Sequence, residues 1–353
     1  MKQHKIIAII GARPQFIKHF PMEKACRDRV DLITIHTGQH YDENMSKVFF
    51  DQLGMRKPDY MLATGGGNHG EQTGKMMIEL ERIVLEEKPD AVMVYGDTNS
   101  TLAGALVATK LQIAVAHIES GLRSYNREMP EEINRVLTDH VSSWLFTPGA
   151  QAVENLKKEG IKNGVFDIGD VMKDLVKYVI EKSMFVKPEI EGTYVYVTLH
   201  RPYNVDTKDR LVQILEQLNQ LGKKIIFAIH PRTRTNATNF GIDFMDYPQI
   251  VFIEPQPYFQ NLGYIYYADV LITDSGGMQK EAYWMKRQCI TVRKETEWTE
   301  TLKDGANVLI FEDLSKLKEC MTPRPIQWDD QLYGEGNSCE RIVNILAQKW
   351  DQQ

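Results

Sequence analysis

The 353-residue sequence lacks the features that mark several large classes of protein. No apolar run is long enough to cross a membrane, and no signal peptide is evident, because Met1–His4 lead directly into the short apolar run Lys5–Ile10. The net charge of −6, with acids and bases interspersed, gives no electrostatic reason to expect a nucleic acid or an anionic membrane as partner. We therefore expect a protein that stays in the cytoplasm.

Cysteine is scarce, and its four positions show no Cys-x-x-Cys spacing. These positions are Cys26, Cys289, Cys320 and Cys339. In a reducing compartment scattered thiols usually pack in the core, so we favour that interpretation over a metal or redox role. Internal repeats and low-complexity tracts are also missing. The length exceeds what one hydrophobic core usually serves, so two domains are expected.

Short apolar runs alternate with helix-like segments in two series. The first series comprises Lys5–Ile10, Leu32–His36, Ala91–Tyr95, Ile113–Ile118, Trp144–Phe146 and Val165–Ile168. The second comprises Tyr194–Leu199, Lys224–Ile229, Ile250–Ile253, Val270–Thr273, Cys289–Val292 and Asn307–Ile310. This alternation predicts an α/β protein with two doubly wound parallel sheets. Ligands bind beyond the carboxyl ends of such strands, so we expect a polar cleft between the domains.

Acidic residues follow two neighbouring strands of the first series. Asp97 comes just after Ala91–Tyr95, and Glu119 comes directly after Ile113–Ile118, with a helix-like segment between the two strands. A third acid, Glu131, would lie in the first turn of a helix that begins at Pro130. Because the strands end at one edge of the sheet, we expect all three carboxylates to face the same crevice.

The first strand leads into GARPQFIK, which is neither a dinucleotide fingerprint nor a Walker motif. Gly11 would allow a tight turn, and Arg13 and Lys18 could join the amides of the helix start in an anion site. An ordinary turn with solvated basic residues is the alternative. The next turn, HTGQH at 36–40, puts two histidines at the same edge, each of which is more typical of a hydrogen-bonded loop than of a catalyst. The glycine-rich segment Gly65–Gly74 predicts a mobile lid or a close backbone approach to ligand, or else a plain connection.

Cationic and titratable groups follow two strands of the second series. His200 and Arg201 end one strand, and His230, Arg232 and Arg234 follow the next. Each could be structural by itself, but together they suit a phosphate-rich ligand, because an arginine in a cleft is costly unless an anion pairs with it.

The segment TDSGGMQKEA is the most informative motif of the second half. Ser275, Gly276 and Gly277 would open a helix whose free amides can hold a diphosphate. Glu281 lies nearly two helical turns further on, where its carboxylate could accept hydrogen bonds from ribose hydroxyls. The alternative is a capped helix with a surface glutamate.

Motifs quoted above, together with others, run in one order along essentially the whole chain. They are GARPQFIK, HTGQHYD, YGDTNSTLAGALVA, AHIESGLRS, PEEINR, TLHR, TDSGGMQKEA, RKETEWTE and YGEGNSCERI. With them the chain resembles the non-hydrolysing UDP-N-acetylglucosamine 2-epimerase family. The resemblance implies two Rossmann-like domains of the glycosyltransferase-B type, with the active site in the cleft between them. The first domain would comprise residues 1–172 plus 339–353, and the second, UDP-binding domain residues 173–338.

The resemblance also implies an isomerase that interconverts UDP-N-acetylglucosamine and UDP-N-acetylmannosamine, nucleotide sugars of polysaccharide biosynthesis. UDP would be eliminated to leave a 2-acetamidoglucal and then re-added with a proton on the other face, without nicotinamide, metal or another cofactor. The implied catalytic residues are Asp97, Glu119, Glu131 and His200. The implied UDP-binding residues are Arg13, Lys18, His230, Ser275, Gly276, Gly277 and Glu281. A homodimer is expected on the same grounds.

Three alternatives remain open. Within the family, Arg123 and Arg127 suggest the branch that acts on UDP-2,3-diacetamido-2,3-dideoxyglucuronate, since an arginine could pair with a sugar carboxylate. From another class, the same fold could serve a glycosyltransferase that moves a sugar from UDP to an acceptor. A non-catalytic UDP-sugar sensor is the third alternative.

Overall fold

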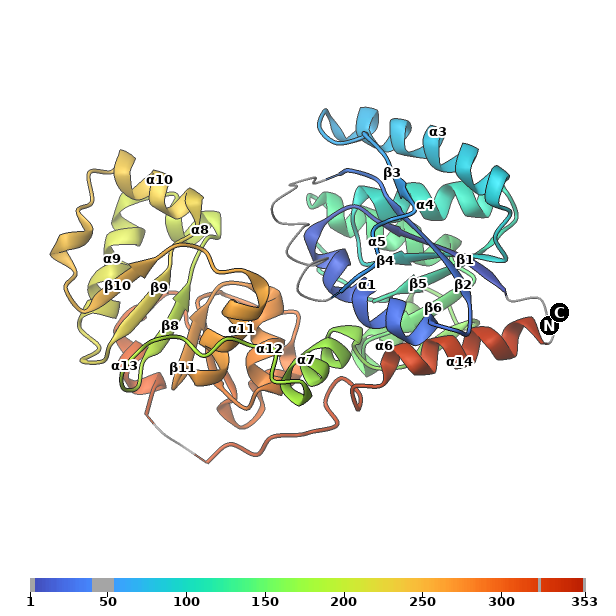
Figure 1. The fold of residues 1–353 in the computed structure, drawn as a ribbon. Helices are drawn as coiled ribbons and strands as arrows, with labels where there is room; N and C mark the ends of the chain where they lie inside the picture. Colours follow the sequence, from blue (N-terminus) through green and yellow to red (C-terminus); the bar gives the residue numbers. More distant parts are fainter. Residues whose placement is uncertain (1–3, 40–53, 323–324, 352–353) are drawn as a thin grey trace. The chain divides into compact units, whose positions relative to one another are not determined.

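A computed structural model describes residues 4–39, 54–322 and 325–351 (Figure 1). The chain forms two compact units, each built on a parallel sheet. The first unit comprises Met1–Tyr178 with Gln331–Gln353, and the second comprises Val179–Asp330. Each unit is described below by itself.

The first unit contains a seven-stranded sheet in the order β3-β2-β1-β4-β5-β6-β7. The strands are β1 (Lys5–Ile10), β2 (Asp31–His36), β3 (Tyr60–Met61), β4 (Ala91–Tyr95), β5 (Ala114–Ile118), β6 (Trp144–Thr147) and β7 (Val165–Asp167). All pairs are parallel, and the strand order reverses between β1 and β4. Strand β4 is completely buried, which explains why its sequence is apolar without alternation.

Helices cover both faces of this sheet (Figure 1). They are α1 (Arg13–Cys26), α3 (His69–Glu87), α4 (Asn99–Lys110), α5 (Pro130–Val141), α6 (Ala150–Lys158), α7 (Val171–Glu181) and α14 (Ser338–Trp350). The C-terminal helix α14 packs beside α1. Its first turn is fixed by Asp174, whose carboxylate accepts hydrogen bonds from the amides of Ser338 at 3.0 Å and Cys339 at 2.7 Å.

The second unit contains a six-stranded parallel sheet in the order β10-β9-β8-β11-β12-β13. The strands are β8 (Val195–Thr198), β9 (Ile225–Ala228), β10 (Ile250–Ile253), β11 (Val270–Thr273), β12 (Gln288–Thr291) and β13 (Asn307–Leu309). The α-helices are α8 (Pro202–Val205), α9 (Lys208–Asn219), α10 (Pro231–Asn239), α11 (Tyr258–Tyr267), α12 (Gly276–Trp284) and α13 (Leu317–Cys320). Short 3-10 helices cover Phe244–Asp246, Thr299–Gly305 and Leu314–Lys316.

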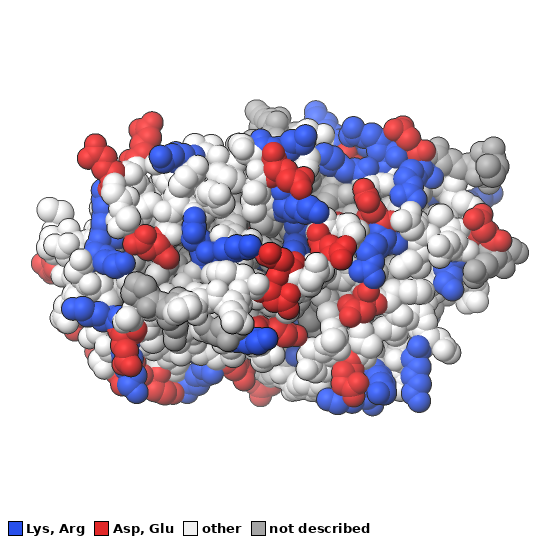
Figure 2. All heavy atoms as spheres, turned by 90° about the horizontal axis from the view of Figure 1, so that it is seen from below, with Lys and Arg blue, Asp and Glu red and all other residues white. Residues whose placement is uncertain are grey.

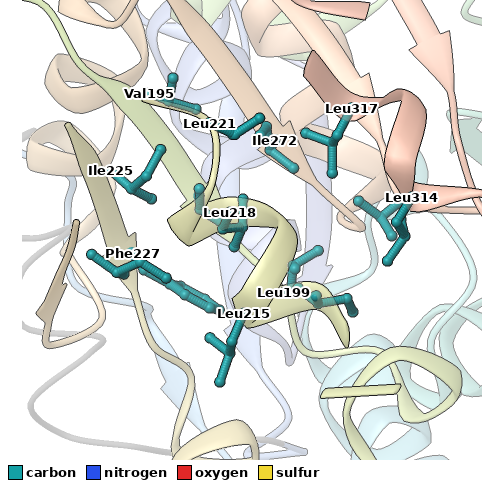
Figure 3. Packing of buried hydrophobic residues seen from close by; sticks show 14 of the residues in the cluster. Val195, Leu199, Leu215, Leu218, Leu221, Ile225, Phe227, Ile272, Leu314 and Leu317 are labelled. Carbon is teal, nitrogen blue, oxygen red and sulfur yellow. The ribbon is translucent and has the colours of Figure 1, made fainter. Parts of the chain in front are cut away.

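One face of this sheet packs against α9 in a dense apolar core (Figure 3). Leu215 and Leu218 of α9 lie among Ile225, Phe227 and other fully buried side chains of the strands. Burying one such side chain stabilises the fold by roughly 1.5–3 kcal/mol relative to leaving it exposed. The core therefore holds the strands rigidly, and the strand ends place polar residues at fixed positions.

The predicted α/β fold with two doubly wound sheets is confirmed. Every predicted strand is present, with bounds that differ by at most one residue at either end. Prediction missed only β3 among the strands of the described residues, because its two residues pair at the edge of the sheet and leave no apolar run in the sequence. On the face seen in Figure 2, lysine and arginine are interspersed with aspartate and glutamate. Among the helices of the described segments, none is long and apolar enough to cross a membrane.

Candidate functional site

Two residues with left-handed backbone lie where β4 and β5 end. Gly96, directly after β4, has φ +61°, and Glu119, directly after β5, has φ +66°. The Gly96 amide donates a hydrogen bond to the Ile118 carbonyl at 3.0 Å, which ties the two strand ends together. A left-handed conformation costs a non-glycine residue about 1–3 kcal/mol, and such strain is concentrated at functional sites. Glu119 is therefore held in a specific place by its surroundings.

The Glu119 carboxylate forms an ion pair with the Lys18 ammonium from α1, and both side chains are 12% exposed. A Cβ atom at Gly96 would lie 3.3 Å from Lys18 Nζ and 3.4 Å from the Glu119 carboxylate. The missing side chain at Gly96 therefore leaves space beside this pair. Lys18, predicted to contact a diphosphate, also neutralises a predicted catalytic acid.

Asp97 is paired with Arg135 of α5, whose other nitrogen donates to the Glu132 carboxylate at 3.0 Å. The Asn134 amide donates to the Asp97 carbonyl at 3.0 Å, so α5 holds both the side chain and the backbone of Asp97. Arg135 and Asn134 lie in the quoted PEEINR motif, but the sequence analysis selected only Glu131 from it. The side chain of Asp97 is 32% exposed, so it can still reach a ligand.

The adjacent glutamates of α5 have different environments. Glu132 is buried and accepts hydrogen bonds from the amides of Ser124 and Tyr125, both at 2.9 Å. Burial alone would raise the pKa of Glu132, but these hydrogen bonds and the charge of Arg135 outweigh it, and the pKa lies below its ordinary value. Glu131 is exposed in the first turn of the helix, which begins at Pro130 as predicted. Glu132 is therefore used within the fold, and Glu131 is the acid at the surface.

Gln15, which the sequence analysis did not select, connects the ends of β1 and β4. Its side-chain oxygen accepts hydrogen bonds from the Gly11 and Ala12 amides at 2.7 and 3.0 Å, and its nitrogen donates to the Tyr95 carbonyl at 2.9 Å. Gln15 therefore fixes the turn before α1 against the turn that carries Asp97. The sequence signature of a capping box needs Ser, Thr, Asp or Asn three residues before the glutamine, and Ala12 stands at that position, so no local signal marked Gln15.

Gly11 is required for a different reason from the one predicted. Its backbone is not left-handed, but a Cβ atom would lie 2.2 Å from both the Ser100 and the Thr37 hydroxyl oxygens. Glycine here allows close packing of β1 against the start of α4 and does not serve a special turn. The side chain of Arg13 lies outside the described parts of the structure.

The polar turns after β2 are structural where the structure describes them. His36 is buried, and its ring accepts a hydrogen bond from the Gly38 amide at 2.9 Å. Burial lowers the pKa of His36 to about 4, so the ring is neutral near pH 7. A Cβ atom at Gly65 would lie 2.3 Å from the Gly38 carbonyl, so the close backbone approach in this segment is made to the chain itself. The loop ends at Asn68, where α3 begins, and His40 lies outside the described residues.

In the second unit, Asp274 organises the residues after β8, although the sequence analysis did not select it. It is fully buried and accepts hydrogen bonds from the amides of His200 and Arg201 at 3.0 and 2.9 Å and from the Asn204 side chain at 3.0 Å. The His200 ring nitrogen Nδ1 lies 3.2 Å from the same carboxylate. An acid directly after the predicted strand Val270–Thr273 was the available signal.

The rings of His200 and His230 lie together, with centroids 5.3 Å apart, because β8 and β9 are neighbours. Burial lowers the pKa of His200, and the Asp274 charge opposes this only in part. Burial, together with the charge of His200, also lowers the pKa of His230. Both rings are therefore neutral at pH 7 and can donate or accept one hydrogen bond without carrying charge.

The arginines predicted to need a ligand anion pair with the protein itself. Arg232 forms a two-pronged ion pair with Asp206, and Arg234 donates to Glu254 at 2.5 Å. These pairs are partly exposed and satisfy the charges without a phosphate. For Arg232 and Arg234 the structural alternative therefore holds, and their charges do not require a phosphate.

Helix α12 begins with an open glycine turn, which we define as Ser275, Gly276 and Gly277. Ser275 makes no side-chain capping bond to the helix. A Cβ atom at Gly277 would meet no described atom within 4 Å, and one at Gly276 would meet nothing closer than 3.7 Å. Neither glycine has a left-handed backbone, so packing and conformation within the described structure do not require glycine at these positions. The open space lies next to the helix amides, where an anion would bind.

Glu281 lies on the same helix and is only 4% exposed, which contradicts the alternative of a surface glutamate. The helix is anchored through Gln279. Its side-chain oxygen Oε1 accepts hydrogen bonds from the Thr296 hydroxyl at 2.6 Å and from the Asn307 side-chain amide at 3.0 Å. Lys280 Nζ lies 3.6 Å from the ring centroid of Trp298. These contacts connect α12 to the ETEW segment of the RKETEWTE motif and keep the glycine turn in place.

Arg123, the candidate for pairing with a sugar carboxylate, is used inside the first unit. It is 8% exposed and donates to Asp139 at 2.7 Å and to both oxygens of Glu159 at 2.7 Å. The prediction that it can pair with a ligand carboxylate was therefore wrong. Arg127 is exposed, so its part of that prediction is not affected.

Comparison with known proteins gives consistent matches. The family model described as UDP-N-acetylglucosamine 2-epimerase matches residues 24–347. The crystal structure of Methanocaldococcus jannaschii UDP-GlcNAc 2-epimerase in complex with UDP-GlcNAc and UDP is 44% identical, with a TM-score of 0.86 and coverage of 98% of this chain and 99% of that chain. A Pseudomonas aeruginosa UDP-2,3-diacetamido-2,3-dideoxy-D-glucuronate 2-epimerase is 44% identical over 97% of this chain and 99% of its own length.

The same architecture extends to glycosyltransferases. A lipopolysaccharide outer core galactosyltransferase shares the fold with a TM-score of 0.57 at 11% identity, over 98% of this chain and 99% of that chain. At that identity the likeness concerns the fold alone. The predicted glycosyltransferase-B type of two Rossmann-like domains is confirmed at this level.

Proposed function

The chain belongs to the UDP-N-acetylglucosamine 2-epimerase family, and from this membership we propose that it interconverts UDP-N-acetylglucosamine and UDP-N-acetylmannosamine. It is thus an epimerase, a class of isomerase. One observation carries the choice of substrate: the family model that matches residues 24–347 is described by this activity, and the M. jannaschii enzyme solved with UDP-GlcNAc and UDP has the same description. The strand-end acids and the open glycine turn supply the groups that this reaction needs.

The proposed reaction begins with removal of the proton next to the anomeric carbon. That proton is weakly acidic, so a base must be held in contact with it while the leaving UDP is stabilised. Asp97, Glu119 and Glu131 are the acids that would remove and return protons on the two faces of the sugar. Lys18 pairs with Glu119 and Arg135 pairs with Asp97, so two of the three carboxylates are held in place before substrate binds.

The leaving UDP would be stabilised by the second unit. The amides of the open glycine turn would bind the diphosphate, and Glu281 would bind the ribose. Neutral His200 and His230 would add hydrogen bonds. Arg13 and Lys18, which belong to the first unit, would add positive charge near the diphosphate. Donors aimed at developing charge lower the barrier most when the protein holds them in place beforehand. The proposal requires the acids and these donors to act on one UDP-sugar molecule, and we expect the protein to close around UDP during the reaction.

Isotope exchange tests the proposal directly. We expect incubation of UDP-N-acetylglucosamine with the enzyme in heavy water to place deuterium on the carbon next to the anomeric centre without net loss of sugar nucleotide. NMR and mass spectrometry of the recovered nucleotide measure both quantities. A glycosyltransferase would instead release UDP only when an acceptor is added, and a sensor would bind tightly without exchange.

A second substrate is favoured by the P. aeruginosa relative, whose 44% identity equals that of the M. jannaschii structure. Sequence identity therefore does not separate the acetamido sugar from the diacetamido uronate. A side-by-side turnover assay with the two UDP-sugars decides between them. Arg127→Ala should lower kcat/KM for the uronate alone if this arginine pairs with the sugar carboxylate.

We further propose that the enzyme is a cytoplasmic homodimer that supplies a nucleotide sugar for polysaccharide synthesis. The resemblance to the family supports this part. Sedimentation equilibrium of the purified chain tests the dimer, and a single species at the mass of one chain would contradict it.

A further inference from the structure

His117 of β5 lies at the centre of a buried polar cluster that no role assigned above explains. Its side chain is fully buried. One ring nitrogen, Nε2, lies 2.7 Å from the Gly96 carbonyl oxygen, and the other, Nδ1, lies 2.7 Å from the Asp139 carboxylate. Both distances are those of strong hydrogen bonds.

The partners of the ring define where its hydrogens are. A carbonyl oxygen accepts hydrogen bonds and cannot donate, so Nε2 must carry a hydrogen to bond with Gly96. The second oxygen of Asp139 accepts hydrogen bonds from the Gly121 amide at 3.0 Å and from Arg123 at 2.7 Å. Asp139 is an anion, because a backbone amide and the permanently charged guanidinium of Arg123 both donate to it. Nδ1 therefore also faces an acceptor and must carry a hydrogen.

The same ring connects the elements that carry the three acids. Glu119 follows directly after the strand that contains His117. The ring nitrogen Nε2 donates a hydrogen bond to the carbonyl of Gly96, which directly precedes Asp97. Its Nδ1 holds Asp139 of α5, the helix that begins with Glu131 in its first turn. The left-handed backbone at Gly96 and Glu119 persists only where the surrounding contacts determine it.

We propose that His117 carries hydrogen on both ring nitrogens and acts as the positioning residue that sets the mutual placement of Asp97, Glu119 and Glu131. The positioning part rests on the proposed epimerase function, whereas the hydrogen positions do not. The charged groups around the ring are Asp139 on α5, Arg123 in the loop after β5 and Glu159 directly after α6, with the Lys18–Glu119 pair next to Gly96. A ring that donates on both sides connects two elements through two hydrogen bonds, and each bond requires the hydrogen on its own ring nitrogen.

The hydrogen positions are tested by nitrogen NMR on the full chain labelled with ¹⁵N-histidine. We expect one histidine with two slowly exchanging ring N–H groups at pH 7.5, and we expect its signals to vanish in His117→Gln. If that variant does not fold, through-bond correlation to the backbone assigns the ring instead. A single N–H on His117 would overturn the proposal. Asp139→Asn removes the negative charge that favours the second ring hydrogen, so the Nδ1–H signal should disappear; its persistence would contradict the role of Asp139.

The positioning role is tested by separating turnover from binding. His117→Gln should lower kcat about 100-fold, because a misplacement of about 1 Å can cost that much, while the Kd for UDP measured by calorimetry changes less than about 3-fold. His140→Gln is the control: this histidine lies on α5 with Nδ1 3.9 Å from the Glu159 carboxylate, is exposed, and its substitution should leave kcat unchanged. Wild-type kcat in a folded His117→Gln protein would refute positioning. Absence of epimerisation in the wild type would refute the proposed function but leave the NMR result intact.

Discussion

The two units present their strand ends in opposite ways. In the first unit, predicted catalytic acids are already paired with the protein's own cations, as in Lys18–Glu119 and Arg135–Asp97. In the second unit, the corresponding edge presents neutral imidazoles and an open glycine turn. Under the proposed function, the same sheet topology would serve proton transfer in one unit and anion binding in the other. Fold alone does not assign either role; the side chains at the strand ends do.

Substitution of the predicted catalytic acids gives the strongest test of this contrast between the two units. Asp97→Asn and Glu131→Gln should each reduce turnover about 100-fold or more, because a base in contact with the substrate contributes at least that much, while UDP still binds. Steady-state kinetics and UDP calorimetry measure the two effects. Glu128→Gln, an exposed neighbour in the preceding turn, is the control and should retain wild-type turnover. Full turnover in both acid variants would remove them from the mechanism.

The ribose contact is expected to have the next largest effect. Glu281→Ala should weaken UDP binding about 10-fold, equivalent to about 1.4 kcal/mol, with a smaller change in kcat. Because Glu281 is buried, thermal unfolding must be measured in parallel, and Glu281→Gln retains the shape of the side chain. Unchanged UDP affinity in a folded Glu281→Ala protein would exclude the ribose contact.

The open glycine turn gives a sharper test, because a substitution there should lower UDP affinity without lowering the stability of the fold. Gly277→Ala has room for its methyl group, so the melting temperature should not fall, yet UDP affinity should drop about 5-fold if the diphosphate lies there. Gly70→Ala is the matched control: its surroundings are equally open, and the structure places it in the first turn of α3 and not in the loop of the predicted glycine-rich segment. Equal UDP affinity in the two variants would show that the glycine turn does not approach the nucleotide.

The smallest effect is expected at Arg232. Its pairing with Asp206 satisfies its charge, so Arg232→Gln should change the Kd for UDP less than about 2-fold at physiological salt. Calorimetry at two salt concentrations measures this. A loss of UDP affinity of 10-fold or more would mean that Arg232 leaves Asp206 and pairs with the phosphate. That result would contradict the contrast between the two units.

Local patterns predicted the strands and the first turns of helices well. Strands such as β4 are buried on both faces, so an apolar run without alternation is directly visible in the sequence. The start of α5 at Pro130 follows from the rigid backbone of proline in the same way. Strand-end positions of Asp97, Glu119 and His200 followed from topology, since parallel strands all end at one edge.

Pairing between distant residues could not be predicted in this way. Gln15 and His117 act through partners more than 20 residues away, and nothing in the local sequence distinguishes them from ordinary polar residues. Asp274 was marked only by its position directly after a strand, and the amides that it binds lie more than 70 residues away. Arg123 shows the converse, because a basic residue in a motif region was interpreted as a ligand contact, although the buried Asp139 and the partly buried Glu159 already satisfy it. Burial and partner identity are properties of the folded chain.

The C-terminal helix α14 has a consequence for how the polypeptide is made. The chain leaves the first unit after Tyr178, builds the second unit as one continuous stretch, and returns at Gln331 to place α14 beside α1. During synthesis the second unit can therefore fold before the first is complete. The apolar surface around α1 stays uncovered until α14 has left the ribosome. A nascent chain that ends before Ser338 should bind chaperones through the N-terminal half, and the full-length chain should be released.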